Sequence, residues 1–91
     1  MLVKIHKSYR NIVAICDSNL LGKKFEQGNL QLDLTTEFFK GEKMTESQVL
    51  EIIEDASRED ASFNVVGEKS IACAIKKGII SKKSIKKIQG I

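Results

Sequence analysis

Short runs of apolar residues, separated by polar turns, predict that the first half of the chain is mainly β-structure. Apolar and polar residues alternate over residues 2–6 and 30–34, and residues 11–16 and 61–66 form compact apolar runs. The polar residues 7–10 have a length typical of a hairpin between the first two strands. Residues 35–44, which follow the strand 30–34, are expected to form a connection. A last strand is predicted over residues 84–89.

Two segments have the periodicity of amphipathic helices. The first begins with Thr45-Glu46-Ser47-Gln48, which fits a capping box, and its apolar residues then recur on one face. The second is predicted over residues 68–77, with Gly78 as its stop signal. Because two helices cannot cover both faces of a five-strand sheet, we expect an α+β fold. The expected architecture is a single domain, 1–91, built as a two-layer sandwich. Its sheet is mostly antiparallel, and both helices pack on one face.

Composition narrows the class of protein further. The chain is 42% hydrophobic and 30% charged, which is typical of a folding sequence. It contains no apolar run long enough to span a membrane, and its first residues lack the layout of a signal peptide. We therefore expect a cytoplasmic protein with no membrane partner.

The net charge of +3 conceals a marked segregation of charge along the chain. Residues 26–60 hold ten acidic and three basic residues, whereas residues 69–91 hold seven lysines and no acid. Such a chain either neutralises itself in the fold or presents a basic face to an anion. The candidate RNA-binding residues are Lys69, Lys76, Lys77, Lys82, Lys83, Lys86 and Lys87, to which the more amino-terminal Lys4, Lys7, Lys23 and Lys24 could add. Aromatic residues lie elsewhere in the sequence, so base stacking is not supported.

A polar cluster at the end of two predicted strands is the other candidate site. The strand 61–66 runs through Gly67 into a helix that begins at Glu68, a geometry that can direct backbone N–H groups toward an anion. Asp17 ends the second strand, and Asn64 interrupts an apolar run. Structural interpretations compete with each of these: Gly67 permits a tight turn, Glu68 stabilises the helix dipole, Asp17 caps residues 18–21, and Asn64 joins an internal hydrogen-bond network.

The remaining reactive residues do not form a catalytic pattern. His6 has no orienting partner nearby in the sequence and is expected to be a surface strand residue. Cys16 and Cys73 are expected to be buried free thiols in a reducing compartment; a disulfide, a metal site with His6 and a reactive thiol are the alternatives. No catalytic residue, metal ligand or cofactor site is predicted, and an enzyme is disfavoured.

An ordered set of segments resembles the small archaeal proteins of domain-of-unknown-function family 424. The segments are 16–34, 38–42, 63–68 and 74–80, and together they cover most of the chain. The positions that match the family pattern are Asp17, Leu21, Gly22, Phe25, Asn64, Gly67, Glu68 and Gly78. Relatives usually continue past the Gln89-Gly90 position with a Val-Pro-His-Ala type of segment, which this sequence lacks.

The resemblance implies an archaeal cytoplasmic α+β protein without an established activity, and gene neighbourhoods in the family point to translation. We therefore expect a non-catalytic accessory factor in translation or RNA metabolism that contacts RNA or a ribosome-associated complex. One alternative is a protein-interaction module or homodimer that uses Phe38, Phe39 and the acidic helix face. The other is an enzyme that binds a phosphate-bearing small molecule near Asn64-Gly67-Glu68. The sequence does not define the oligomeric state.

Overall fold

The computed structural model describes residues 1–28 and 30–79 of the 91-residue chain. Its main sheet has the strand order β5-β1-β2-β6. The hairpin strands β1 (Leu2–His6) and β2 (Ile12–Cys16) are antiparallel, as the sequence predicts, and β5 (Glu42–Lys43) is antiparallel to β1. β6 (Ser62–Val66) lies parallel to β2 at the other edge.

The two predicted helices are confirmed as α1 (Glu46–Arg58) and α2 (Glu68–Lys76). The capping box that begins α1 forms as expected: Gln48 donates its N–H to the Thr45 hydroxyl, and the Gln48 side-chain oxygen accepts the Thr45 N–H at 2.9 Å. This local signal fixes the start of α1 without help from the rest of the fold.

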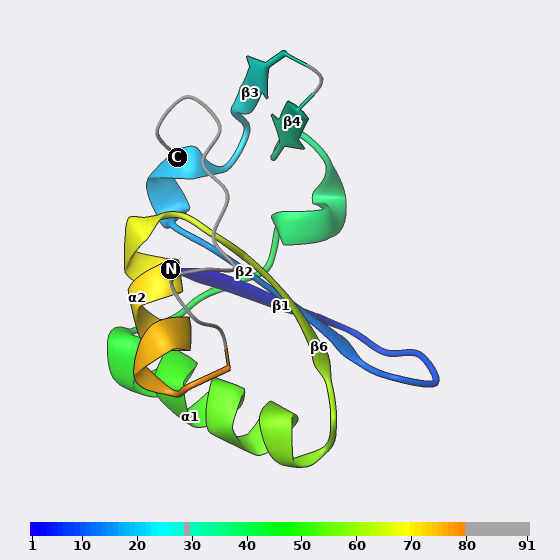
Figure 1. Cartoon of the computed structure of the whole chain (residues 1–91), viewed down its shortest axis with the longest axis vertical. Helices are drawn as coiled ribbons and strands as arrows, with labels where there is room; N and C mark the ends of the chain where they lie inside the picture. Colours follow the sequence, from blue (N-terminus) through cyan, green and yellow to red (C-terminus); the bar gives the residue numbers. More distant parts are fainter. Residues whose placement is uncertain (29, 80–91) are drawn as a thin grey trace.

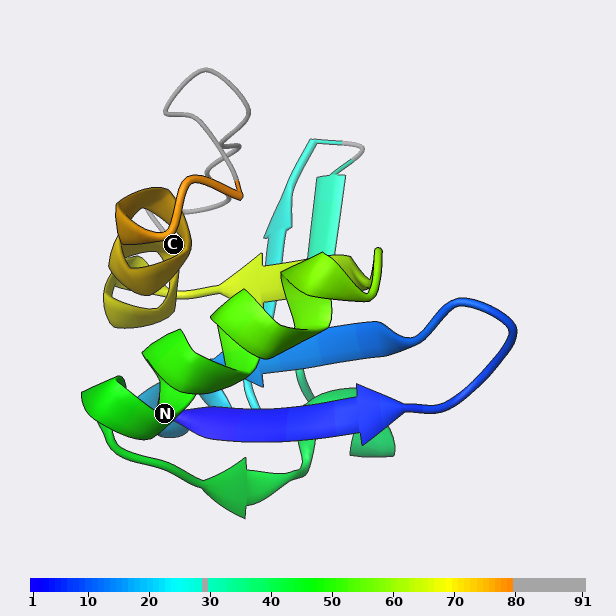
Figure 2. The same cartoon turned by 90° about the horizontal axis from the view of Figure 1, so that it is seen from below.

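Both helices lie on the same side of the sheet (Figure 1, Figure 2), which confirms the expected mostly antiparallel α+β architecture. Alternate residues of β1 and β2 point toward the helices and are sealed from water by them. The buried core on this side consists of Val3, Val13, Ile15, Val49, Ile53 and Cys73. Burial of this apolar area is the main force that holds the helical layer on the sheet.

The opposite face of the sheet is also covered, by a thinner layer that the sequence reading did not foresee. Leu30–Asp33 (β4) was expected in the main sheet but instead pairs with β3 (Lys24–Gln27) in a separate two-stranded sheet. Two 3-10 turns, η1 (Ser18–Leu20) and η2 (Glu37–Phe39), complete this layer. Its core is formed by Ala14, Cys16, Leu20, Leu34 and Phe39. The physical reason is that β2 carries apolar residues on both faces, and the helices cover only one of them.

The connection over residues 35–44 contains a further strand, β5, that was not expected. The chain reaches the edge of β1 at Gly41, where any Cβ atom would overlap the carbonyl group of Val3. Glycine therefore permits the close approach that lets Glu42 pair with Val3. The predicted strand 84–89 lies outside the described residues. Within the described part of the chain, no helix has the length and apolar character needed to cross a bilayer.

Candidate functional site

The start of α2 is capped by a carboxylate from a distant part of the chain. Asp17, which follows β2, accepts the backbone N–H groups of Lys69 at 3.0 Å and Ser70 at 2.8 Å. The Ser70 hydroxyl donates to the same carboxylate at 2.7 Å. Both side chains are buried, so these bonds are shielded from competing water. The prediction that the Asp17 side chain caps residues 18–21 is therefore wrong: η1 has no side-chain cap hydrogen bond.

Gly67 makes room for this carboxylate. The residue has a φ of 106°, and a Cβ atom at this position would overlap the Asp17 carboxyl group. Only glycine adopts such a backbone conformation readily. Gly67 thus serves both a turn and a close approach, and the sequence reading anticipated only the turn.

The polar cluster predicted from the sequence is only partly assembled. Asp17 and Gly67 come into direct contact, and Glu68 lies exposed in the first turn of α2. Asn64 is exposed on the edge strand β6, so it needs no internal hydrogen-bond partner to remain there. The Asp17 carboxylate already accepts hydrogen bonds from the N–H groups of Lys69 and Ser70. An external anion bound at this helix terminus would need the same two donors.

A hollow of about 460 Å³ opens beside this cap, beyond the carboxyl ends of the parallel strands β2 and β6. Ligands of α/β sheets commonly bind at this end of parallel strands. We call it the Lys43–Lys69 hollow; it is lined by Met1, Asp17, Ser18, Asn19, Lys43, Glu68 and Lys69. A neighbouring hollow of about 470 Å³ shares Met1 and Lys69 with it.

Two lysines at this end of the molecule form no ion pair within the described structure, although acidic side chains line the same hollows. Lys43 and Lys69 form no ion pair with any residue in the described ranges, although Glu68 lines the same hollow. Lys76 is exposed on α2, about 10 Å further along the helix axis than Lys69. It too lacks an ion pair among the described residues. These three lysines, Lys43, Lys69 and Lys76, form what we call the basic face.

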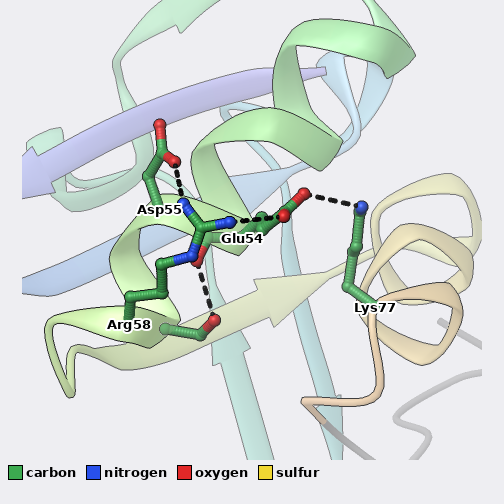
Figure 3. A network of polar contacts seen from close by, with 5 residues as sticks. Glu54, Asp55, Arg58 and Lys77 are labelled. Carbon is green, nitrogen blue, oxygen red and sulfur yellow. Dashed lines mark hydrogen bonds and ion pairs between the residues drawn. The ribbon is translucent and has the colours of Figure 1, made fainter.

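Two of the lysines expected on that face form ion pairs with carboxylates. Lys77 donates to Glu54 at 3.0 Å, which links α2 to α1 (Figure 3). Lys77 and Arg58 together lower the pKa of the Glu54 carboxyl group, the hydrogen bond from Lys77 being the largest cause. Lys24 pairs with Glu26 at 3.3 Å. The predicted binding residues Lys82, Lys83, Lys86 and Lys87 lie outside the described residues.

Lys4 and Lys7 do not converge on the basic face. Lys7 belongs to the turn between β1 and β2, which lies at the opposite end of the sheet from the start of α2 (Figure 2). The ammonium group of Lys4 donates to the backbone carbonyl of Glu37 at 3.2 Å, on the face of the sheet away from the helices. The surface of positive charge is therefore smaller than the sequence suggests.

The apolar pair Phe38-Phe39 does not form the exposed patch expected for an interface. Phe39 is buried, with 7% of its surface exposed, and Phe38 is half-buried. The His6 ring stacks on Phe38 with centroids 4.3 Å apart, and its Nε2 lies 2.9 Å from the Phe38 carbonyl oxygen. His6 is therefore a packing residue that covers Phe38, a role that no local sequence pattern indicated.

The two cysteines of the described chain are not placed for metal binding or nucleophilic chemistry. Cys16 and Cys73 are free and buried, as predicted, and burial raises the pKa of both thiols. Neutral buried thiols are poor nucleophiles. The described residues contain no group of three or more histidine, cysteine or acidic side chains placed to hold a metal ion.

Fold and site together define a small α+β protein with an uneven charge distribution and an open hollow at one end of its sheet. The chain belongs to the family described as "Protein of unknown function (DUF424)", whose pattern it matches over residues 6–91. This confirms the family resemblance inferred from the ordered segments.

A solved structure has the same fold. It is described as the crystal structure of an uncharacterized conserved protein from Methanopyrus kandleri, and its TM-score is 0.84. The similarity covers 98% of this chain and 83% of that one at 23% sequence identity, so the comparison supports the fold alone. The source of that structure agrees with the archaeal occurrence that the resemblance implies. No curated protein matches the sequence.

Proposed function

We propose that this chain is a non-catalytic, cytoplasmic accessory protein of translation or RNA metabolism that binds RNA or a ribonucleoprotein through its basic face. The supporting observation is that Lys43, Lys69 and Lys76 remain without ion pairs in the described structure, while Lys24 and Lys77 are held by carboxylates. Ammonium groups without carboxylate partners can exchange their condensed counterions for RNA phosphates.

Lysine side chains around an open hollow suit the RNA backbone better than its bases. Lysine presents a compact charge with no fixed plane, which recognises phosphate without reading sequence. The basic face contains no aromatic residue on which bases could stack. Residues 80–91 add four lysines and no acid to the sequence that follows α2. The proposed contact is therefore electrostatic and weakly selective for sequence.

The direct test is a salt titration of RNA binding. We expect a fluorescently labelled single-stranded oligouridylate to bind, with log affinity falling linearly as log salt concentration rises. The triple substitution Lys43→Gln, Lys69→Gln and Lys76→Gln should reduce the magnitude of that slope by about 2, since each single-strand phosphate contact contributes about 0.7.

Matched control variants are Lys24→Gln and Lys40→Gln, because both lysines are paired with acids on other surfaces. Their slopes should equal that of the unmodified protein. The proposal is rejected if no complex forms at low salt, or if the control substitutions weaken binding as much as the basic-face substitutions do.

A further inference from the structure

Ile5 is an apolar residue that the fold leaves conspicuously uncovered. It lies in β1 on the helix side of the sheet, yet 45% of its surface is exposed, whereas Val3 on the same side is only 3% exposed. Two hollows meet at its side chain. One, of about 210 Å³, lies toward α1 and is lined in part by Ile52, Asp55, Ala56 and Glu59. The other, of about 440 Å³, follows the edge of β1 past Gly41 and Met44.

The backbone of Ile5 is also directed toward this open edge. Ser62 donates to the Asn11 carbonyl and Asp17 donates to the Val66 carbonyl, so the odd-numbered residues of β2 bond with β6. The even-numbered residues of β2 therefore bond with Leu2, Lys4 and His6 of β1. The N–H and C=O groups of Ile5 consequently face away from β2.

The strand β5 is too short to pair with the N–H and C=O groups of Ile5. β5 is in register with Leu2 and Val3 only. Ile5 lies opposite Val13 of β2, but on its other side no strand that the structure describes pairs with it. An unpaired donor and acceptor beside an exposed apolar side chain form an edge to which another strand can be added.

The charge on the helix side of Ile5 indicates the chemistry of the partner, whereas the hollow along the edge of β1 is lined by Lys4, Lys40 and Glu42. Residues 46–60 hold six acidic residues and one arginine. Asp55 shares Arg58 with Glu54, and its distance to that guanidinium, 3.4 Å, is longer than the 2.7 Å of Glu54. Glu59 forms no ion pair with any described residue. The helix-side hollow is thus apolar at its base and negative at its rim.

We propose that the β1 edge at Ile5 binds an extended segment of a partner protein, in which an apolar residue is followed two positions later by lysine or arginine. Residues two apart share one face of a strand, so the apolar side chain would enter the hollow beside Ile52 and Ala56. The basic side chain would then reach Asp55 or Glu59. This surface uses residues other than the basic face and attracts charge of the opposite sign, so it goes beyond the proposed RNA contact.

The test uses the full chain and a labelled nine-residue peptide with leucine and lysine alternating at odd positions and threonine at even positions. We expect saturable binding by fluorescence anisotropy. Ile5→Ser should weaken it about five- to tenfold, because part of an isoleucine-sized contact is lost. Tyr9→Ser is the matched control, since Tyr9 is fully exposed in the turn after β1 and should leave the affinity unchanged.

Two further measurements distinguish strand addition at the β1 edge from nonspecific peptide binding. The amide proton of Ile5 should exchange more slowly with solvent in the complex, as measured by NMR, because it becomes a ladder donor. Asp55→Asn combined with Glu59→Gln should abolish the preference for this peptide over one with glutamate in place of lysine. The proposal is overturned by equal binding of the two peptides to the unmodified protein, by unchanged Ile5 exchange, or by a dimer that occupies this edge and dissociates on Ile5→Ser.

Discussion

Asp17 and Gly67 lie far apart in the sequence, yet at the residue scale they form one unit that fixes the start of α2. The carboxylate satisfies two backbone N–H groups and the buried Ser70 hydroxyl, and the glycine gives it the space to do so. A buried donor that loses its acceptor costs the full free energy of its desolvation. Both residues should therefore be sensitive to small changes.

Asp17→Ala should lower the free energy of unfolding by about 2 kcal/mol, since it removes a helix cap and leaves the Ser70 hydroxyl without its acceptor. Asp17→Asn keeps an acceptor oxygen and should cost less. Urea denaturation measures both values, with Asn19→Ala as an exposed neighbouring control. Equal midpoints for Asp17→Ala and the control would show that the carboxylate does not hold α2.

Gly67→Ala should destabilise the fold more than Gly22→Ala. Both glycines have positive φ values, 106° and 85°, but only at Gly67 would a Cβ atom meet another group. We expect at least about 2 kcal/mol at Gly67 and about 1 kcal/mol at Gly22 from denaturation curves. Similar losses at the two positions would mean that the approach of Asp17 imposes no steric demand.

At the residue scale, hydrogen bonds between residues close in the sequence could be predicted, and those between distant residues could not. The capping box of α1 was predicted because its partners, Thr45 and Gln48, are three residues apart. The cap of α2 was not, since Asp17 and Ser70 are 53 positions apart. One signal was present: Gly67 precedes α2 and has no side chain with which to cap it, which leaves the first N–H groups of α2 open to an acceptor from elsewhere.

At the scale of elements, strands could be recognised more reliably than their partners. The alternation over residues 30–34 correctly predicted a half-buried strand, but alternation does not say which sheet buries it. The apolar run of β2 required cover on both faces, and that requirement explains the separate β3-β4 sheet. The antiparallel pairing of β1 and β2 could be predicted, because a short polar turn joins them.

The link between α1 and α2 makes a prediction about pH. Lys77 and Arg58 lower the pKa of Glu54 in the fold, so this contact stabilises the protein at neutral pH. The stabilisation should disappear as pH falls below the ordinary carboxyl value, 4.5, and through the lower pKa of the folded state. Lys77→Gln should accordingly lower the thermal midpoint slightly at neutral pH and make no difference in acid.

Lys76→Gln is the control for this measurement, because Lys76 is on the same helix and lacks an ion pair in the described structure. Its thermal midpoint should follow that of the unmodified protein at every pH. A constant deficit for Lys77→Gln from neutral pH into acid would show that Lys77 acts through packing instead of through the Glu54 carboxylate.

At the scale of the whole molecule, charge is separated between surfaces. Lys43, Lys69 and Lys76 have no ion pair among the described residues around α2 and β5, while Asp55 and Glu59 line the hollow between Ile5 and α1. The sequence predicted this separation in outline, since its acidic and basic residues are segregated along the chain. It did not predict that Lys77 and Lys24 would be neutralised locally, because ion pairs depend on which elements meet.

The most direct measurement of the central proposal, that the basic face binds RNA, is an NMR titration of the labelled protein with a single-stranded oligouridylate at low salt. We predict that the amide signals of the first turn of α2 and of β5 shift progressively, and that those of the β1-β2 turn and of residues 51–59 do not. Shifts confined to the β1-β2 turn or to α1, or no shifts at any position, would contradict the proposal.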